Sequence, residues 1–560
     1  MASSQTVDQS EYHHSARRQF KWQNVLFIVA ASLGSCMYGY SASVISTTLI
    51  QPSFVKAMGL DTAPDASDLI GLTGSMYQVG GFLGTFAVSP ISDRWGRKVG
   101  IAVPAVFACV TSALLAGSVN IHMFIAFRFF AGMAAYIIVS TVPVWMSEVA
   151  PPSVRGVLVD IHGISLLFGY ALASWIGYGF WKGGDSNGWR GLQALNALPG
   201  VLLLCFLPWL PESPRWLLMK DRYEDAATVL KSLHTEEEAA VELSQISTQV
   251  RIDRTLDSSY WALIKKPSYR KRAIMSFLIP AGIQLSGPLV LNNYGPTLYG
   301  ALGYDTEQQF LYQIGWYTVA IGGGILALFV VERVARPKLI AFGIQFCLCC
   351  LAIEAALVAT YTTPEALANP NNSALSAAVA MLFVYVVMWE ICLDGTQFVY
   401  ISEICPNHLR AKGIALGMAG LCAMNIMWLQ VAPIAFKNIG WKFYLCFIIP
   451  GTVFVCFLLY WFPDTRRIPL EEVAKIFGDQ DEIASALELE KSSESAVEKV
   501  DTEKASLEAT KEAGTKAPMV LSHVEMPEGG RLDISGLLRW NEDDGDNLKS
   551  RRGGAVERTL

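Results

Sequence analysis

The sequence predicts an all-α membrane protein with twelve transmembrane helices. Only 16% of its 560 residues are charged and 52% are hydrophobic, whereas a soluble domain carries about a quarter charged residues. The charges gather in residues 211–272, in the tail after 463 and in a few short loops. Between them lie apolar runs of about 20 residues, which is the length of helix that crosses the hydrocarbon core of a bilayer.

Twelve such runs follow one another along the chain, and each is expected to form one spanning helix. They are residues 24–47, 68–91, 99–119, 122–145, 157–181, 190–210, 273–299, 310–331, 339–361, 375–401, 413–436 and 442–462. No short apolar stretch with a cleavage site precedes the first run, so we expect no removable signal peptide.

The Lys and Arg residues of the loops predict the orientation of the helices. The loops on the side of the N-terminus, leaving out the long segment 211–272, contain nine basic residues, whereas the opposite loops contain only Lys56, Lys182 and Lys437. Because basic loops stay on the cytosolic side, both termini are expected in the cytosol. The chain is thus predicted to be an integral multi-pass protein, and we expect it in the plasma membrane.

The segments outside the apolar runs differ in composition. Residues 211–272 contain RYEDAATVLKSLH, whose apolar spacing predicts an amphipathic helix. The tail, rich in Glu, Lys, Ser and Ala from about 481, is expected to be mostly disordered. The predicted parts are a cytosolic N-terminal tail (1–23), a six-helix bundle (24–210), a cytosolic helical linker (211–272), a second six-helix bundle (273–462) and a cytosolic C-terminal tail (463–560).

Three charged motifs occur twice, once in each half of the chain. SDRWGRK (92–98) corresponds to VERVARPK (331–338), SEVAPPSVRG (147–156) to SEICPNHLRAKG (402–413), and PESPRWL (211–217) to PDTRRIPLEE (463–472). Each motif recurs on the same side of the matching span, so the two six-helix halves are predicted to be pseudo-symmetric about an axis along the membrane normal. Transporters built from such parallel repeats place their substrate site between the halves.

These motifs and their order resemble the sugar porter family of the major facilitator superfamily over residues 24–478. The family's D-R-x-G-R-[RK] loop is present at 93–98, and its second copy is degraded at 332–336. The element E-x-x-P-x-x-x-R-G and the signature P-E-S-P-R-W-L are both complete. The resemblance implies an alternating-access secondary transporter that binds a small-molecule substrate in a lipid bilayer.

The charged motifs are expected to form a cytosolic gate. Its candidate residues are Asp93, Arg94, Arg97, Glu148, Arg155, Glu332, Arg333, Arg336, Glu403 and Arg410. Carboxylates interleaved with arginines at helix ends can form charge-assisted hydrogen bonds, so one cluster between spans 2 and 3 and another between spans 8 and 9 are predicted to latch the halves together. The alternative is that these residues serve only as positive-inside anchors.

The substrate positions that the resemblance implies match the family less well. Gly163 stands where the family's fifth span has a glutamine, and Ile283 and Leu289 replace polar residues of the seventh span. Asp394 stands at the first position of the family's G-P-x-x-W element in the tenth span. The polar and aromatic candidates for substrate binding are His162, Gln284, Asn292, Asn293, Tyr294, Phe398 and Asn425.

These replacements leave the substrate class open. A sugar presents several hydroxyl groups, each of which needs a hydrogen-bond partner once it leaves water. A monosaccharide or polyol is favoured by the resemblance, whereas the apolar replacements would suit a less hydroxylated solute such as an organic acid or a secondary metabolite. A non-transporting nutrient receptor is the third hypothesis, because the C-terminal tail is long.

Three charged residues lie deep inside predicted spans and are candidates for coupling. Arg128 stands where the family has an arginine in span 4, but Ser41 replaces the carboxylate that faces it in proton-linked members. That loss favours a uniporter, although Glu390 and Asp394 in VVMWEICLDG (386–395) could carry protons instead. The alternative for Arg128 is a buried donor to backbone carbonyl groups.

The two carboxylates should sit near the middle of the bilayer, because Asp394 and Glu390 precede Glu403 by nine and thirteen residues at about 1.5 Å per residue. A charge at that depth is costly in lipid. We therefore expect both to face the cavity between the halves, on the side of spans 7 and 11. The alternative is a buried structural pair.

Enzymatic function is not expected. The sequence contains no phosphate-binding Gly-Lys-Ser/Thr loop and no His, Cys and carboxylate set with metal-ligand spacing. We expect no cofactor, no metal and no nucleic-acid partner. The net charge of −6 comes mostly from the tail and says nothing about nucleic acid. The protein is expected to be monomeric.

Overall fold

The computed structural model describes residues 22–151, 155–184, 186–255, 259–331, 333–363, 366, 370–466 and 476–478. The side chains of 155–157, 237, 252, 255 and 407 lie outside this description. All regular structure within the described residues is helical.

The first six predicted spans correspond to seven helices. These are α2 (Trp22–Leu49), α4 (Ala66–Trp95), α5 (Arg97–Ala116), α6 (Ile121–Val149), α7 (Arg155–Lys182), and the consecutive α8 (Gly188–Leu195) and α9 (Ala197–Phe206). A short helix, α3 (Pro52–Ala57), lies between the first two spans. Most predicted ends agree with the helix ends to within a few residues.

The last six spans follow the linker helices. The linker comprises α10 (Pro214–Met219), α11 (Tyr223–Leu233), α12 (Glu236–Thr255) and α13 (Tyr260–Lys265). The spans are α14 (Pro267–Ile283) with α15 (Pro288–Ala301), α16 (Thr306–Val330), α17 (Arg336–Tyr361), α19 (Asn372–Trp389) with α20 (Gly395–Ile404), α21 (Arg410–Ile439) and α22 (Leu445–Trp461).

Length and composition mark ten stretches of the described chain as able to cross a membrane. One of them, Arg410–Trp461, contains both α21 and α22, and α4 is long enough but less apolar than the rest. The twelve-helix prediction is therefore confirmed as a layout. The predicted amphipathic segment of the linker is also helical, as α11.

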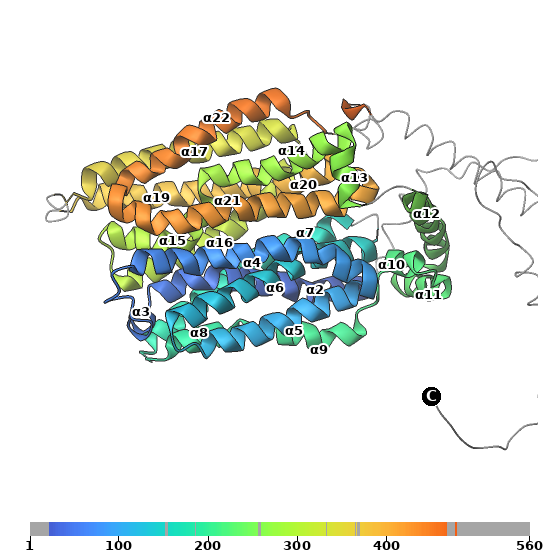
Figure 1. Cartoon of the computed structure of the whole chain (residues 1–560), viewed down its shortest axis with the longest axis horizontal. Helices are drawn as coiled ribbons and strands as arrows, with labels where there is room; N and C mark the ends of the chain where they lie inside the picture. The colour runs from blue at the N-terminus through green and yellow to red at the C-terminus, as the bar shows by residue number, and fades with distance from the viewer. Residues whose placement is uncertain are drawn as a thin grey trace, which may run out of the picture. The chain divides into compact units, whose positions relative to one another are not determined.

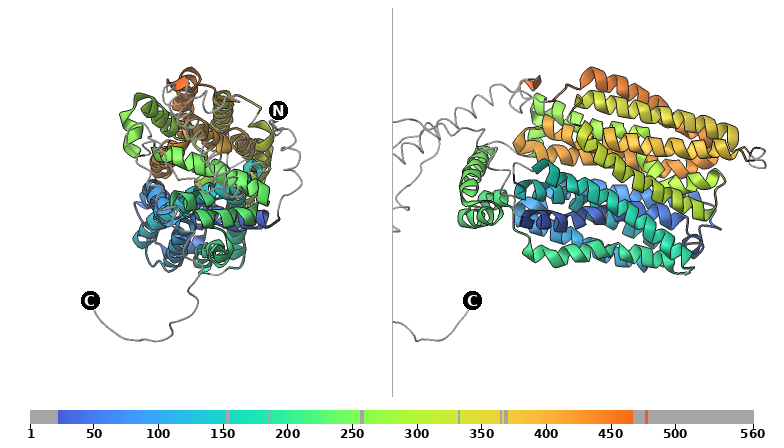
Figure 2. Two further views of the ribbon diagram at one scale, coloured as in Figure 1. Left: turned by 90° about the vertical axis from the view of Figure 1, so that its right-hand side faces the viewer. Right: turned by 180° about the vertical axis from the view of Figure 1, so that it is seen from behind.

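The spanning helices run side by side in two groups (Figures 1 and 2). The blue to teal helices α2–α9 form one group, and the green to orange helices α14–α22 form the other. The helices α10–α12 lie at one end of the bundles, which we call the linker end, and the opposite end is the far end. Helices α10–α12 have a small core of their own around Trp216, Leu217, Leu230 and Leu243.

Glycines set the close packing of helices within the first group. A Cβ added at Gly132 of α6 would lie 1.9 Å from the carbonyl oxygen of Tyr77 in α4, and one at Gly80 would lie 1.8 Å from that of Phe129. The same holds between α2 and α7, where Gly39 lies against the carbonyl of Leu166. Small residues let helix backbones approach closely in a membrane, where packing replaces the hydrophobic drive.

Three spans are interrupted, and the hydropathy pattern of the sequence did not indicate these breaks. Span 6 divides at Asn196, and span 7 divides at Gly287, whose φ of 78° is left-handed and which precedes Pro288. Span 10 contains a π-helical segment, Glu390–Asp394, between α19 and α20. Such π-helical turns widen the helix by one residue and occur often at functional sites.

Replacing Gly132 with alanine should destabilise the protein, because the new methyl group overlaps the Tyr77 carbonyl and forces α4 and α6 apart. We expect a loss of about 1–3 kcal/mol, measured as a lower thermal midpoint of the purified protein in detergent. Gly179→Ala in α7 is the matched control, since its Cβ would meet nothing within 4 Å. Equal midpoints for the two variants would contradict the packing described here.

Candidate functional site

The two groups of helices meet along three helix pairs: α4 with α21, α7 with α16, and α2 with α15. Between α4 and α21, Ser75 Oγ donates to Gln430 Oε1 at 2.8 Å. Between α7 and α16, the rings of Tyr170 and Tyr317 lie 5.4 Å apart. The candidate substrate residues must be judged by their position relative to this interface.

The far end of the interface is closed by contacts between α7 and α16. Tyr178 Oη donates to Glu307 Oε1 at 2.8 Å, and Lys182 Nζ lies 3.3 Å from the same oxygen. Beside these residues, the rings of Trp181 and Phe310 lie 5.5 Å apart. These residues join the two halves directly and were not singled out from the sequence, although a lysine and a glutamate at the same ends of spans 5 and 8 were visible there.

Arg128 is buried in the first half with a relative exposure of 1%. Its Nη1 donates to the Ser41 carbonyl at 3.0 Å and its Nε to the Thr73 carbonyl at 3.2 Å. The guanidinium also lies over the Tyr77 ring, 4.3 Å from its centre. No ion pair involves Arg128 in the described part of the chain, so its geometry is that of a donor to backbone carbonyl groups.

His162 lies on α7 and faces α2. Its Nδ1 is 2.6 Å from Ser35 Oγ, so one ring nitrogen is used within the first half. The neighbouring Gly163 borders open space, because an added Cβ would meet no atom within 4 Å. The position at which the resemblance implies a glutamine therefore carries no side chain and borders open space.

Some polar candidates of span 7 already have hydrogen-bond partners within the protein, whereas others do not. Asn292 accepts a short hydrogen bond from Tyr317, and Tyr294 Oη donates to the Leu429 carbonyl at 3.0 Å. Tyr294 Oη also lies 3.3 Å from the position of a Cβ on Gly74 of the first half. Asn293 is buried with an unbonded Oδ1, and Gln284 is buried within the break of the span.

Two further candidates lie on spans 10 and 11. Asn425 is 1% exposed and its Nδ2 has no hydrogen-bond partner. Phe398 is partly buried and packs against the apolar cores of both halves. Together with Tyr294, Phe398 is the candidate that the structure places directly at the interface.

Glu390 and Asp394 occupy the two ends of the π-helical segment. A Cβ on Gly323 of α16 would lie 2.9 Å from Glu390 Cβ, so Glu390 packs on that glycine. Asp394 interacts electrostatically with the phenol groups of Tyr38 on α2 and Tyr170 on α7, which belong to the other half. Neither carboxylate forms a hydrogen bond or an ion pair with any described residue.

We expected Glu390 on the side of spans 7 and 11. This expectation is corrected, because Glu390 lies against Gly323 of span 8. The π-helical turn changes the register of the helix, and Gly323 leaves room for the side chain. Cys392 and Leu393 take up the face toward Gly343 of α17. The carboxylates therefore point away from the outer helix α17.

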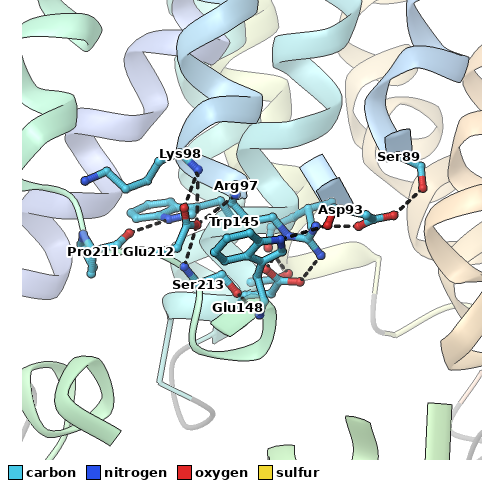
Figure 3. Close-up of polar contacts among 12 residues, drawn as sticks. Ser89, Asp93, Arg97, Lys98, Trp145, Glu148, Pro211, Glu212 and Ser213 are labelled. Carbon is cyan, nitrogen blue, oxygen red and sulfur yellow. Dashed lines mark hydrogen bonds and ion pairs between the residues drawn. The ribbon is translucent and has the colours of Figure 1, made fainter. Parts of the chain in front are cut away.

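A hydrogen-bonded cluster of charged residues lies at the linker end of the first half (Figure 3). Arg97 forms a two-pronged pair with Glu148, with Nε and Nη2 each 3.0 Å from a carboxylate oxygen. Its Nη1 donates to Asp93 at 2.7 Å. Asp93 in turn accepts from Ser89 Oγ at 2.6 Å. This arrangement engages all three guanidinium nitrogens of Arg97 and joins α4, α5 and α6.

Glu212, the first acid of the P-E-S-P-R-W-L signature, caps α5. Its carboxylate accepts from the backbone N–H groups of Arg97 and Lys98 at 3.0 and 3.3 Å. A carboxylate is favoured at a helix N-terminus, where the free N–H groups and the helix dipole meet it. Burial nevertheless raises the pKa of Glu212, although these N–H donors oppose the shift.

The second half has a smaller cluster at the same end. Arg336 Nη2 lies 2.9 Å from Glu403 Oε1, and Thr465 Oγ1 donates to Glu403 Oε2 at 2.6 Å. The carbonyl of Arg333 accepts from Arg466 at 2.6 Å. Glu332 and the Arg155 side chain lie outside the described residues, so their expected roles in the gate have no structural description.

The remaining gate candidates lie apart from these clusters. Arg94 is exposed beside the Trp95 ring, with its guanidinium 5.4 Å from the ring centre. Arg410, at the start of α21, interacts electrostatically with Arg215 and Asp253 of the linker. Arg215 and Asp253 themselves form an ion pair at 2.5 Å.

The clusters do not latch one half to the other in this structure, which corrects that expectation. Arg97 is bound by Glu148 and Asp93 of its own half, and Arg336 by Glu403 of its own half. All three guanidinium nitrogens of Arg97 thus donate to carboxylates of its own half. An ion pair that does join the halves is that of Lys182 and Glu307 at the far end.

No group of three His, Cys, Asp or Glu residues in the described ranges is arranged to hold a metal ion. The site is instead an interface between two groups of spanning helices, with polar side chains at mid-depth and ion-pair clusters at one end. That arrangement defines a transporter of the major facilitator type.

The family model "Sugar (and other) transporter" matches residues 27–477, and the chain belongs to this family. The MFS-type transporter criB of Aspergillus cristatus is 28% identical over 461 residues, which cover 81% of this chain and 93% of that protein. The high-affinity glucose transporter of Kluyveromyces lactis is 27% identical, covering 84% of this chain and 88% of that protein.

A solved structure has the same fold. The inward-open xylose transporter XylE from E. coli superposes with a TM-score of 0.66 at 22% identity, covering 80% of this chain and 98% of that chain. The predictions of the family and of its fold are thus confirmed.

The variant Arg97→Ala should lower stability and slow transport without removing the protein from the membrane. It leaves Glu148, whose side chain is 11% exposed, without its partner, and breaking a buried ion pair costs about 3–5 kcal/mol. Initial transport rates at equal surface amounts and the thermal midpoint both report the effect. Arg94→Ala, on the same loop but exposed, is the control, and wild-type behaviour of both variants would refute a role for the cluster.

Proposed function

We propose that this transporter carries a neutral, hydroxyl-rich small solute, a monosaccharide or a polyol, by alternating access. The observation that carries the proposal is the distribution of charge at mid-depth. Arg128 is held by two backbone carbonyls and the Tyr77 ring, whereas no described residue pairs with Glu390 or Asp394. Among the described residues at this depth, the site therefore offers unpaired carboxyl groups, whereas its cation, Arg128, is buried.

That balance favours a neutral solute over an organic acid. A carboxylate substrate would need a cation to replace its water, and the described residues at this depth offer no accessible one. Hydroxyl groups, by contrast, can donate to Asp394 and to the unbonded Asn293 Oδ1, and accept from the unbonded Asn425 Nδ2. Tyr294 and Phe398 supply apolar surface beside them, as sugar sites require.

The remaining candidates have supporting roles in this proposal. His162 presents the edge of its ring that Ser35 does not use, next to the open space at Gly163. Gln284 and Asn292 line the break in span 7. The loss of a glutamine at 163 removes one hydrogen bond from the family's set, and Asp394 on the opposite half supplies another.

The membrane topology belongs to the proposal as well. The linker end is the cytosolic end, both termini are cytosolic, and the plasma membrane is the location, because nine basic loop residues against three favour that orientation. The bundles 24–210 and 273–462 move as units, with 211–272 between them. The ion-pair clusters stiffen each unit at its cytosolic end, and the closed far end faces outward.

Any coupling to protons runs through Glu390 and Asp394 in this proposal. Ser41 provides no carboxylate to Arg128, and its carbonyl is already bonded to the guanidinium. The environment of Asp394 changes as the halves separate, because the phenols of Tyr38 and Tyr170 belong to the opposite half. A carboxylate whose surroundings alternate in this way can take up and release a proton during the cycle.

A substrate panel in a transporter-null yeast tests the charge argument. We expect uptake of labelled hexoses, pentoses or polyols and none of organic acids, because the buried Arg128 cannot pair with a substrate anion. Uptake of an acid with no uptake of neutral hydroxylated solutes would overturn the proposal in favour of an organic-acid transporter. Absence of all uptake and exchange at normal surface amounts would favour the receptor hypothesis.

The double variant Glu390→Gln, Asp394→Asn tests the coupling. It should lose accumulation of substrate against a gradient while retaining exchange of labelled for unlabelled substrate, since only the proton carrier is removed. Glu354→Gln is the control, because Glu354 is a buried carboxylate of α17 away from the interface. Concentrative uptake by the double variant would show that these carboxylates do not carry the proton.

A further inference from the structure

The helix α13 presents apolar side chains on the face that does not hold it to the protein. Trp261 is 67% exposed and Ile264 is 55% exposed, whereas Leu263 is 2% exposed. At 100° per residue, Trp261, Ile264 and Lys265 share one face, and Ala262 and Leu263 lie on the other. The buried face packs through Leu263 on Tyr269 and Leu409, and the residues that the structure describes leave the exposed face without a partner.

Basic residues surround this exposed face. The segment 259–272 contains five of them and no acidic residue: Lys265, Lys266, Arg270, Lys271 and Arg272. Lys265, Arg270 and Lys271 are exposed, whereas Arg272 is buried under the Phe477 ring, 4.5 Å from its centre. Exposed cations therefore flank the exposed tryptophan and isoleucine.

The position of α13 places this surface where the spans end. Lys265 is the last residue of α13, and α14 begins at Pro267 and continues as a span. Helix α13 crosses the end of the bundle at the linker end (Figure 1). Tryptophan is enriched at this depth of a membrane, and Lys and Arg near the surface are attracted to anionic lipid headgroups.

We propose that α13 and the first turn of α14 form a docking surface for anionic phospholipid headgroups. Trp261 and Ile264 enter the boundary between headgroups and acyl chains, and Lys265, Arg270 and Lys271 contact the negative charges. An aqueous acidic peptide would match the cations but would leave the tryptophan and isoleucine without an apolar partner. A charged lipid surface matches both.

Docking at this surface would act on the interface between the halves. The Tyr260 ring of α13 lies 6.0 Å from the ring of Phe86 on α4, and Lys412 Nζ of α21 lies 5.4 Å from the centre of the Tyr260 ring. Helix α13 thus contacts one helix of each half at the linker end. Anionic lipid should therefore change the transport rate as well as protect α13.

Hydrogen–deuterium exchange of the full-length protein in nanodiscs tests the proposal. Exchange of residues 259–272 is compared in phosphatidylcholine with and without phosphatidylserine. We expect slower exchange with phosphatidylserine, by at least roughly tenfold, because each basic residue strengthens attraction to an anionic surface roughly fivefold. The protection should weaken as salt is raised, and equal exchange in the two membranes would overturn the proposal.

Two variants separate the contributions of charge and apolar contact. The triple variant Lys265→Gln, Arg270→Gln, Lys271→Gln should lose the effect of phosphatidylserine, and Trp261→Ser, Ile264→Ser should weaken protection in both membranes. The matched control is Lys220→Gln, Tyr223→Ser, which changes an exposed lysine and an exposed aromatic of the linker away from α13. Loss of the lipid effect in the control would overturn the assignment to α13.

The acidic residues that follow Phe477 are the competing occupant. Phe477 stacks near the same basic segment, and Asp479, Asp481 and Glu482 come soon after it. In the variant Asp479→Asn, Asp481→Asn, Glu482→Gln, protection by phosphatidylserine should persist. Faster exchange of residues 259–272 in this variant than in the wild type, or equal exchange in both membranes of the wild type, would assign the surface to the tail instead.

Discussion

A polar group inside a membrane must find its partner within the protein, and this constraint decides most of the arrangement. Water is absent, so an unsatisfied group costs several kcal/mol. Arg128 meets the constraint with two carbonyls and a ring, and Tyr294 with the Leu429 carbonyl. Among the described residues, Asn293 Oδ1, Asn425 Nδ2 and the carboxyl groups of Glu390 and Asp394 have no such partner, and in the proposed function a substrate or a proton supplies it.

The same constraint explains why rigidity and opening are separated in this protein. Within each half, helices touch backbone to backbone at glycines, and charged clusters fix their linker ends. Between the halves, the contacts include aromatic rings, amide and hydroxyl hydrogen bonds and an exposed ion pair, besides a close approach of Gly71 in α4 to the Gln430 backbone in α21. A change of state can therefore exchange weak contacts at the interface while each half keeps its strong ones.

Hydropathy and loop charge were enough to predict the spans, because twenty apolar residues between charged loops have few alternatives to a spanning helix. The breaks were not predictable in this way. Gly287 and the π-helical turn at Glu390–Asp394 depend on which helix lies opposite, and Gly323 is remote in sequence. The expected neighbours of Glu390 were wrong for that reason. The pairing of Arg97 with a carboxylate, by contrast, followed from the motif alone. The partners across the interface, Tyr178 and Glu307, could not be paired without the fold.

The exposure of the pair that closes the far end has a consequence for how the transporter responds to its surroundings. The side chains of Lys182 and Glu307 are 63% and 44% exposed, and exposed pairs are weak and are screened by dissolved ions. The balance between closed and open far ends is therefore set partly by the medium that bathes that end. Ionic strength on that side of the membrane would then contribute, beside the buried ring contacts, to how long the substrate site stays shut.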